Sequence, residues 1–397
     1  MKKYTGIFIF IFLFGFTAQG SEVDDLLITV DVDDRSGGGC SIMKAKPDGS
    51  ISEFVSGTDI LSITGRPGCD LEDTGIASLL DGVIYFNEDR SGDILFAATD
   101  NIVRRFIADE VLDTLLPDNV DIDNGMAVNK VTGTLVIADE NNGAILELPP
   151  AFSTPIVDPS LVKILATGAD FEALVPLGSA INAEGGIAID DQQNIYVANE
   201  DLVNNTANVI FKLTPQGDVS VLCTQAELMG VIGVAPRLDV GMAFDGSLFV
   251  ADSNCNCVLE INPVSCSPQI LIAEAQINSL TGNTSADLNG GLCIDRDKNL
   301  YVGDNGSISQ SSRNPSIIKI PTDINSSASL FVSADQVRAL YGDIAPDGNP
   351  QFQGLCTVKL ADTGFNVPAL SNGGAIVLAL VLGLTGLFIA RRKMAAL

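Results

Sequence analysis

The sequence predicts an all-β fold, a six-bladed β-propeller of four-stranded blades. First, a unit made of a glycine, a short apolar run, a polar turn and a second apolar run closed by Asp or Asn recurs about every 50 residues, the period of a propeller, solenoid or array. Second, an outer apolar hairpin follows each unit. Third, a last copy of the unit near Gly354 supplies the strand that the first blade lacks.

The repeat is clearest in four copies, and a fifth has the same layout. The copies are GIASLLDGVIYFNED from Gly75, GMAVNKVTGTLVIAD from Gly125, GIAIDDQQNIYVAN from Gly186, GMAFDGSLFVAD from Gly241 and GLCIDRDKNLYVGD from Gly291. Each predicts a strand, a tight turn and a second strand. Outer hairpins such as NVIFKLTPQGDVSVL, after Asn199, raise the unit to four strands, which is a propeller blade rather than a solenoid rung.

The first blade is expected to draw on both ends of this region. Residues 26–56 provide three strands, beginning with a run, Leu26 to Asp31, that matches the second strand of a blade. GLCTV from Gly354 matches GLCID from Gly291, so residues 354–360 are expected to form the innermost strand of blade one. This pairing would close the ring and leave no open sheet edge. The propeller then spans residues 21–360 as one domain, with blade starts near 75, 125, 186, 241, 291 and 354.

Connections between blades are less clear from the repeat. The longest is Pro149 to Ala183, between blades three and four, which the repeat does not explain. Short helical patterns occur at Ala108 to Leu116 and Ala334 to Tyr341, where acidic residues precede apolar spacing.

Both chain ends carry membrane-directed signals. Residues 1–20 have two lysines, a long apolar stretch and a small-residue cleavage region, as in a secretory signal peptide. Residues 361–371 form a linker, and residues 373–390 are uncharged and long enough for a transmembrane helix. Arg391, Arg392 and Lys393 follow and are expected to stay on the cytoplasmic side.

The residues around this span resemble a bacterial sorting signal. Val367-Pro368-Ala369-Leu370-Ser371, Gly374, the apolar run and the arginine pair resemble the IPTL-CTERM tails of Gram-negative bacteria, with Val and Ala in place of Ile and Thr. The resemblance implies that residues 372–397 are recognised by a sorting enzyme of exosortase type. It further implies that the protein passes through the inner membrane by residues 373–390 and reaches the cell surface or extracellular matrix. The alternative is a permanent membrane anchor.

Composition excludes several function classes. The chain has 50 acidic and 22 basic residues, a formal net charge of −28, and no histidine or tryptophan. An acidic surface argues against nucleic acid as a partner. Without histidine, Ser-His-Asp, Cys-His and His-ligated metal chemistry are impossible. The acidic side chains either keep an exported protein soluble or bind a divalent cation such as Ca²⁺.

Eight cysteines lie between the two ends. An even number in an oxidising compartment favours disulfides, although their pairing cannot be read from the sequence. Cys255, Cys257 and Cys266 lie close enough in sequence to suggest a metal site, but a fourth ligand is lacking nearby.

The blade pattern resembles the NHL and gluconolactonase-like six-bladed propellers, over residues 26–360. In that family, metal ligands come directly before the repeat glycine, where only Asn124 matches here. Two residues before the glycines lie acidic or amide side chains in five of six blades, which could ring the channel mouth or merely satisfy turn donors. Asn124, Glu184 and Asp239 are therefore the candidate ligands for a possible Ca²⁺ ion; no other cofactor and no catalytic residue is predicted.

Two functions remain open at this point. The first is a non-enzymatic surface or matrix propeller that binds an extracellular protein, glycan or matrix component. The second is a cation-dependent, lactonase-like hydrolase whose metal polarises a carbonyl at the central channel. The Asp or Asn that closes the second strand recurs at Asp31, Asp139, Asn199, Asp252 and Asp304. Because it recurs in nearly every blade, we interpret it as structural.

Overall fold

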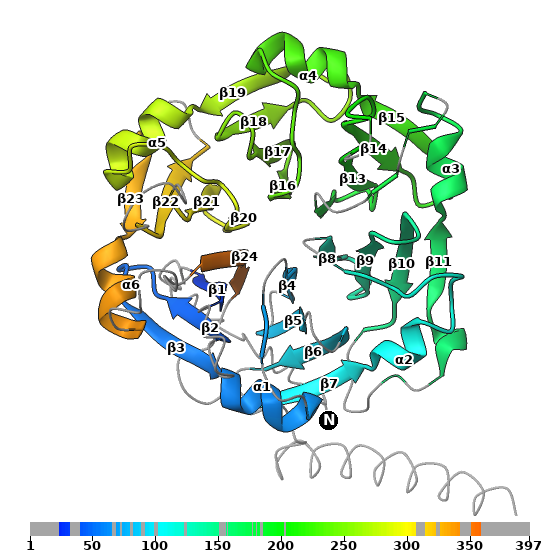
Figure 1. Cartoon of the computed structure of the whole chain (residues 1–397), viewed down its shortest axis with the longest axis horizontal. Helices are drawn as coiled ribbons and strands as arrows, with labels where there is room; N and C mark the ends of the chain where they lie inside the picture. Colours follow the sequence, from blue (N-terminus) through cyan, green and yellow to red (C-terminus); the bar gives the residue numbers. More distant parts are fainter. Residues whose placement is uncertain are drawn as a thin grey trace, which may run out of the picture. The chain divides into compact units, whose positions relative to one another are not determined.

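Six four-stranded antiparallel sheets stand around a central channel in the computed structural model (Figure 1). The structure describes residues 24–31, 40–65, 69–71, 74–79, 82–88, 92–98, 102–122, 125–150, 156, 158–176, 178–179, 181–182, 186–201, 204–306, 314–322, 326–341 and 351–358. The six blades of four strands confirm the predicted fold class. The predicted signal peptide, linker, sorting tail and transmembrane helix lie outside the described residues. None of the helices in the described ranges is both long and apolar enough to cross a bilayer.

Blade 1 is built from both ends of the described chain. Its sheet order is β24-β1-β2-β3. The strands are β24 (Gln351–Val358), β1 (Asp25–Asp31), β2 (Cys40–Ala45) and β3 (Ile51–Ser56). β24 pairs antiparallel with β1, with Leu355 opposite Ile28 and a register shift between Thr29 and Val30. The innermost strand thus comes from the end of the chain that the GLC match indicated, and it begins three residues earlier than predicted.

The other five blades each use a continuous stretch of chain. Blade 2 contains β4 (Ile76–Leu79), β5 (Val83–Glu88), β6 (Asp93–Ala97) and β7 (Val103–Ile107). Blade 3 contains β8 (Met126–Val128), β9 (Leu135–Asp139), β10 (Ala144–Leu148) and β11 (Lys163–Ala166). Blade 4 contains β12 (Ile187–Ile189), β13 (Ile195–Asn199), β14 (Val209–Leu213) and β15 (Val219–Cys223).

Blades 5 and 6 complete the set. Blade 5 contains β16 (Gly241–Asp245), β17 (Ser247–Asp252), β18 (Cys257–Ile261) and β19 (Pro268–Ile272). Blade 6 contains β20 (Leu292–Ile294), β21 (Asn299–Asp304), β22 (Ser316–Pro321) and β23 (Ser329–Val332). One interpretation from sequence was wrong: the long connection from Pro149 to Ala183 contains β11, the fourth strand of blade 3, which pairs with β10.

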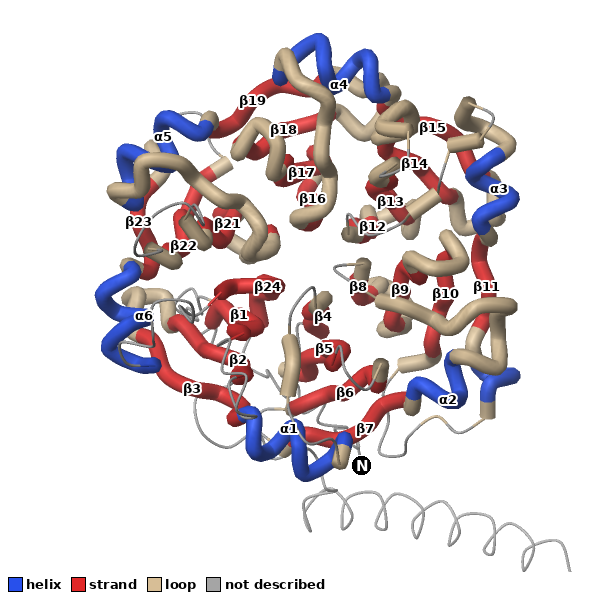
Figure 2. Tube along the Cα trace, in the orientation of Figure 1, coloured by secondary structure: helices blue, strands red, loops and turns tan. Residues whose placement is uncertain are grey.

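A short helix follows the outermost strand of every blade and lies on the outer rim of the ring (Figure 2). The helices are α1 (Gly57–Thr64), α2 (Asp109–Leu112), α3 (Gly168–Glu172), α4 (Gln225–Ile232), α5 (Glu274–Thr281) and α6 (Ala334–Tyr341); a 3-10 turn, η1 (Pro159–Leu161), precedes β11. Several begin with a capping box. In α4, Thr224 Oγ1 accepts from the Glu227 amide while the Glu227 carboxylate accepts from the Thr224 amide.

The hydrophobic core lies between neighbouring blades. The second and third strands of most blades are almost wholly buried, because each face of a blade packs on the next. One cluster joins blades 5 and 6 through Phe249, Val258, Leu300 and Ile318, all at most 2% exposed. Such burial supplies the main stabilisation of the ring, at about 25 cal/mol for each Å² of apolar surface removed from water.

The repeat glycines bring the innermost strands together. Gly186 has φ +88°, and a Cβ atom there would lie 2.9 Å from the Cα atom of Gly241 in the next blade. Gly291 has φ +81°, and its Cβ would lie 2.7 Å from the Leu355 nitrogen. Only glycine satisfies both the positive φ and the close approach at these two positions. The first residue of the repeat is therefore needed to build the wall of the channel.

Candidate functional site: the central channel and its mouth

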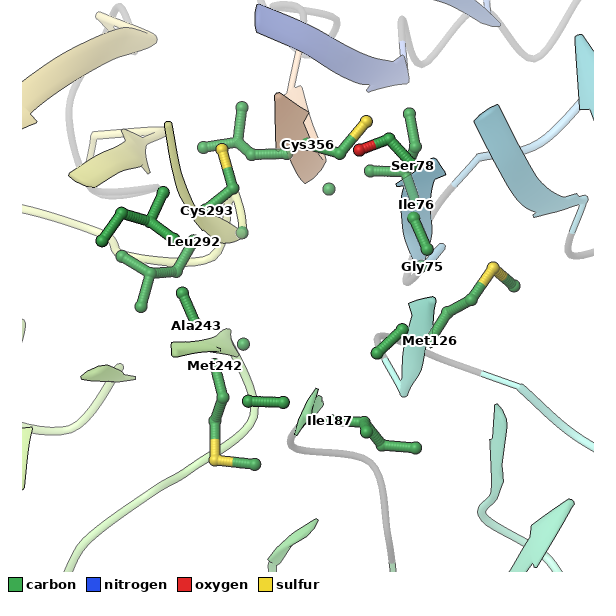
Figure 3. Close-up of a pocket in the computed structure, with 18 of the residues that line it drawn as sticks. Gly75, Ile76, Ser78, Met126, Ile187, Met242, Ala243, Leu292, Cys293 and Cys356 are labelled. Atoms are coloured by element: carbon green, nitrogen blue, oxygen red, sulfur yellow. The ribbon is translucent and has the colours of Figure 1, made fainter. Parts of the chain in front are cut away.

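The innermost strands enclose a central cavity of about 140 Å³. Figure 3 shows the side chains that the six strands contribute to its wall. The residues directly after the repeat glycines are apolar in every blade: Ile76, Met126, Ile187, Met242, Leu292 and Leu355. Among the described residues that line the cavity, Lys130 carries the one formal charge. Such a wall can hold water or a small apolar group, and its described lining offers no carboxylate as a base or metal ligand.

The second residue after each glycine is small throughout. These residues are Ala77, Ala127, Ala188, Ala243, Cys293 and Cys356, which we call the small-residue ring. Four of its members are alanine, and the two cysteines occupy neighbouring strands, β20 and β24 (Figure 3). The sequence analysis matched GLCID to GLCTV but did not infer that the two cysteines lie on neighbouring strands.

A second recurrent set lies where the second strand of each blade ends. In five blades this side chain accepts a hydrogen bond from a backbone N–H in the loop that leads to the same blade's innermost strand. The acceptor–donor pairs are Glu88 Oε1 and Asp70 N (3.0 Å), Asp139 Oδ1 and Asp121 N (3.0 Å), Asn199 Oδ1 and Asn182 N (2.7 Å), Asp252 Oδ2 and Arg237 N (3.0 Å), and Asp304 Oδ1 and Asp287 N (2.8 Å). We call these five acceptors the loop anchors.

A backbone hydrogen bond in the opposite direction supports the same attachment. In four blades, the residue after the loop anchor donates its N–H to the carbonyl of the same loop residue. The donor–acceptor pairs are Glu140 and Asp121, Glu200 and Asn182, Ser253 and Arg237, and Asn305 and Asp287. Each loop is thereby held at two points, which agrees with the structural role inferred from the recurrence of Asp and Asn. Glu88 performs the same task in blade 2 and was missed because its side chain is longer.

Other polar groups near the mouth join one blade to the next. Asn182 Nδ2 donates to Glu140 Oε1 at 3.0 Å between blades 4 and 3. Arg237 Nε lies 3.3 Å from Glu200 Oε1 between blades 5 and 4. Asn305 Nδ2 donates to the Phe352 carbonyl at 3.0 Å, and its Oδ1 accepts from the Phe352 N–H at 2.8 Å, so blade 6 is tied to β24.

Burial raises the pKa of three loop anchors, all of them aspartates. Desolvation raises the pKa of Asp139 to about 6, and it raises that of Asp252 to about 6 as well. The pKa of Asp304 is also raised by burial, although hydrogen bonds from Asp287, Asn283 and Gly306 lower it. These shifts come from the removal of carboxylates from water. The buried positions of these carboxyl groups in the fold therefore explain their raised pKa values.

The predicted metal ligands divide into two groups. Asn124 and Glu184 lie outside the described residues. Asp239 is 6% exposed, and both of its oxygens are bonded: Ser253 Oγ donates to Oδ1 at 2.6 Å, and Arg237 Nε lies 2.8 Å from Oδ2. A cation at Asp239 would compete with the Arg237 guanidinium for this carboxylate. No group of three or more Cys, Asp or Glu side chains placed to hold a metal ion occurs within the described ranges.

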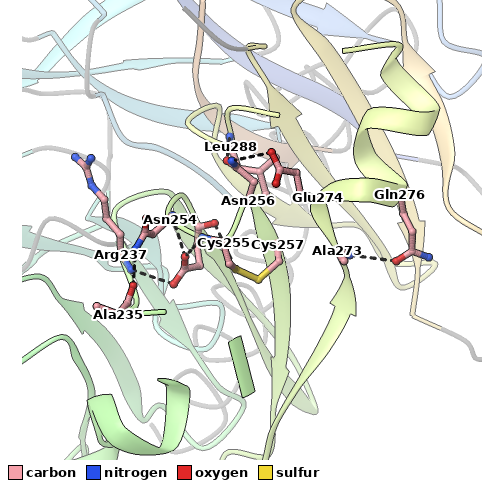
Figure 4. The surroundings of a disulfide bond; sticks show 11 residues. Ala235, Arg237, Asn254, Cys255, Asn256, Cys257, Ala273, Glu274, Gln276 and Leu288 are labelled. Atoms are coloured by element: carbon pink, nitrogen blue, oxygen red, sulfur yellow. Dashed lines mark hydrogen bonds between the residues drawn. A yellow bond between two sulfur atoms is a disulfide. The ribbon is translucent and has the colours of Figure 1, made fainter. Parts of the chain in front are cut away.

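Six of the eight cysteines form three disulfides, as expected, and Cys293 and Cys356 are thiols. The disulfides join Cys40 with Cys69, Cys223 with Cys266, and Cys255 with Cys257. Figure 4 shows the last of these, with Asn256 between the two cysteines. Asn256 Oδ1 accepts from the Leu288 N–H at 3.3 Å and so joins this turn of blade 5 to the loop before blade 6. The metal interpretation of Cys255, Cys257 and Cys266 is wrong, because all three sulfurs are in disulfides.

Comparison with known proteins supports the fold. No protein-family model and no curated protein sequence matches the chain. A chain of the nidogen/laminin complex is similar, with 14% identity, a TM-score of 0.52, and coverage of 84% of this chain and 97% of that one. A streptogramin B lyase (15% identity, TM-score 0.39, 65% and 67% coverage) and a protein described as a gluconolactonase (13% identity, TM-score 0.38, 70% and 77% coverage) are also similar. At 14% identity the likeness to the nidogen/laminin chain concerns the fold alone.

Proposed function

We propose that this protein is an exported six-bladed β-propeller that acts as a non-enzymatic binding or structural module at the cell surface or in the extracellular matrix. The observation that carries this choice is the use of the polar groups around the channel. The loop anchors and Asp239 are bonded to the ring itself. Most side chains that line the cavity are apolar, and its described lining contains no carboxylate. Polar groups that maintain a scaffold suit a rigid platform whose outer loops meet a partner.

Delivery is the second part of the proposal. The apolar start of the chain directs export, and residues 372–397 serve as a sorting signal that an exosortase-type enzyme handles after residues 373–390 enter the inner membrane. The partner of the displayed ring is an extracellular protein, a glycan or a matrix component. The net charge of −28 makes nucleic acid an unsuitable partner.

The pairing of β24 with β1 has a place in this function. We infer that it closes the ring, because it gives blade 1 the fourth strand that every other blade has from its own stretch of chain. A chain from which residues 351–358 are deleted should fail to give a protease-resistant ring, because β1 would become an unpaired edge. A ring of unchanged stability in that deletion would contradict the inference.

Cell fractionation tests the delivery. The full chain should be found on the cell surface or in the matrix, and mass spectrometry of its C-terminus should reveal loss of the basic tail. A chain ending at Ser371 should bypass sorting and be released in soluble form. A matched variant with Lys in place of Arg391 and Arg392 keeps the positive charge and should remain membrane-inserted. Uncut full-length protein in the inner membrane would favour a permanent anchor instead.

The alternative hydrolase is tested on the same purified ring. Calcium titration by calorimetry and hydrolysis of a panel of lactones should both be negative if the module is non-enzymatic. Calcium binding and turnover that are lost together in Glu184→Ala and in Asn124→Ala, and kept in Glu110→Ala, would overturn the proposal in favour of a cation-dependent lactonase.

A further inference from the structure

Two cysteines of the small-residue ring stand side by side in the channel wall. Cys293 lies on β20 of blade 6 and Cys356 lies on β24 of blade 1, each two residues after a repeat glycine. Both are thiols and both are buried, with exposed fractions of 8% and 4%. The other four members of the ring are alanine. A cysteine is therefore not needed for size at this position, and its occurrence on two adjacent strands calls for a chemical explanation.

Contacts between the same two strands lie on both sides of the pair. Ahead of the cysteines, a Cβ atom on Gly291 would lie 2.7 Å from the Leu355 nitrogen. Beyond them, Thr357 Oγ1 donates to the Ile294 carbonyl at 2.8 Å. Cys293 and Cys356 occupy the interval between these contacts and share one side of the channel (Figure 3). These contacts keep the two strands close on both sides of the pair. In this structure the Cys356 thiol is directed toward Ser78 (Figure 3), so the disulfide requires this side chain to rotate toward Cys293.

We propose that Cys293 and Cys356 form a fourth disulfide, which fastens β24 to blade 6, when the chain folds in an oxidising compartment. The inference rests on the proposed export. One cysteine thiolate attacks a donor disulfide of that compartment, either a protein disulfide or oxidised glutathione, and releases one donor thiol. The second cysteine then displaces the other donor thiol. The two cysteines lose two electrons and two protons, and the donor disulfide is reduced to two thiols.

The surroundings of the pair determine when this reaction occurs. Burial raises the pKa of the Cys356 thiol to about 12 and raises that of Cys293 well above its ordinary value. The reactive thiolate is therefore scarce once the ring has formed. The bond forms while β24 and β20 are coming together, and later burial protects it from reductants. Once made, it holds β24 at the channel in position to pair with β1.

Thiol counting tests the inference directly. The full chain is purified from its producing cell, unfolded in the presence of N-ethylmaleimide, and mapped by mass spectrometry without reduction. The expected result is no alkylated cysteine and a cross-linked peptide pair that contains Cys293 and Cys356. Alkylation of these two alone, with the other six oxidised, would overturn the inference and leave export standing.

A second arm covers the remaining outcome. If all eight cysteines are alkylated, the proposed export is contradicted, and the pair is then judged by refolding the reduced chain in glutathione redox buffer. A Cys293–Cys356 linkage in the refolded ring supports the inference without export. Two alkylated thiols at these positions in a ring whose other six cysteines have paired overturn it.

The chain offers a matched control, because alanine already fills the equivalent position in four blades. A Cys293→Ala/Cys356→Ala double variant should fold and should melt about 5 °C below the oxidised wild type, since the bond closes a loop of roughly 60 residues. Each single variant should expose one alkylatable thiol. After reduction of all disulfides, the wild type and the double variant should melt within about 2 °C of each other. Equal melting before reduction would contradict the proposal.

Discussion

The loop anchors recur in five blades and the small-residue ring in all six, but they recur for different reasons. The anchors vary in chemistry between Glu, Asp and Asn, yet all five accept the same kind of hydrogen bond from a loop N–H. The small-residue ring varies in one place only, where two cysteines replace alanine on neighbouring strands. The first position is thus selected for an acceptor oxygen and the second for volume. The Glu and Asn anchors still meet the need for an acceptor oxygen, so their differences need no functional explanation. The two cysteines are not explained by volume, because alanine meets that need in the other four blades.

The largest loss of stability is expected when a loop anchor is removed. Asp304 is fully buried and accepts from Asp287 N, Gly306 N and Asn283 Nδ2 at 2.8–3.0 Å. Asp304→Ala leaves the two backbone N–H groups without this acceptor and leaves Asn283 Nδ2 with only its longer bond to the Asn314 carbonyl, at 3.4 Å. It should lower the free energy of unfolding by about 3 kcal/mol, as measured by urea denaturation. The exposed Glu110→Ala on α2 is the control and should leave the unfolding midpoint unchanged. A midpoint equal to that of the wild type in Asp304→Ala would disprove the anchoring role.

A subtler change asks whether one anchor can replace another. Asn199 accepts from Asn182 N at 2.7 Å and also donates through Nδ2 to the Ala207 carbonyl at 2.7 Å. Asn199→Asp keeps the first bond but sets a carboxylate oxygen against a carbonyl, so it should destabilise the protein by about 2 kcal/mol. Denaturant titration at pH 7 measures the loss. If the variant is as stable as the wild type, the anchors are interchangeable and the amide in blade 4 has no separate role.

Two loop anchors should also make the stability of the protein depend on pH. Asp139 and Asp252 have pKa values raised to about 6 by burial, above the value near 3.8 expected in the unfolded chain. Each of these carboxyl groups therefore binds its proton more tightly in the folded state than in the unfolded state. The stabilisation of the fold that results is complete below pH 3.8 and is lost as the pH rises through 6. Each carboxyl should make the protein about 1 kcal/mol more stable at pH 5 than at pH 7.

The measurement is a denaturant titration at the two pH values. An Asp139→Asn/Asp252→Asn double variant should lose this part of the pH dependence, whereas Glu110→Ala should retain it. An identical slope in the double variant and the wild type would assign the dependence to other groups.

The smallest effect is expected in the small-residue ring. In the fully reduced chain, Cys293→Ala exchanges one small apolar side chain for another that four blades already carry. Its free energy of unfolding should fall by about 1 kcal/mol or less, because the volume change is slight. Ala188→Leu at the equivalent place in blade 4 is the matched overpacking variant and should lose more. A larger loss for Cys293→Ala than for Ala188→Leu would show that volume does not govern this position.

Much of the ring could be predicted because it is written in local patterns. Strand-turn-strand units are set by apolar runs and turn residues close in sequence, so the five inner hairpins of blades 2 to 6 were found. The rim helices were predicted in only two of six blades because they are short and their apolar spacing is weak. A signal was nevertheless available: Ser56 with Asp59, Thr167 with Asp170, and Thr224 with Glu227 have the spacing of a capping box.

The site was less predictable because it depends on contacts between distant residues. The position of Asp239 before its glycine suggested a ligand, but its pairing with Arg237 and Ser253 depends on how two loops fold together. Disulfide pairing is likewise a three-dimensional property, since Cys40 meets Cys69 across 29 positions of sequence. The equivalent positions of Cys293 on β20 and Cys356 on β24 could have been derived by aligning the two GLC copies.

The composition of blade 1 also sets an order of events during synthesis. Strands β1, β2 and β3 are made first, and β24, which pairs with β1 along its whole length, is made last. Without β24, blade 1 would be a three-stranded sheet in which β1 is an unpaired inner edge. Pairing of β1 with β24 joins segments more than 300 residues apart, and contacts between such distant segments form slowly. A chain that ends before residue 351 would have five four-stranded blades and a three-stranded blade 1. The unpaired backbone groups of β1 would then be open to pairing with another chain.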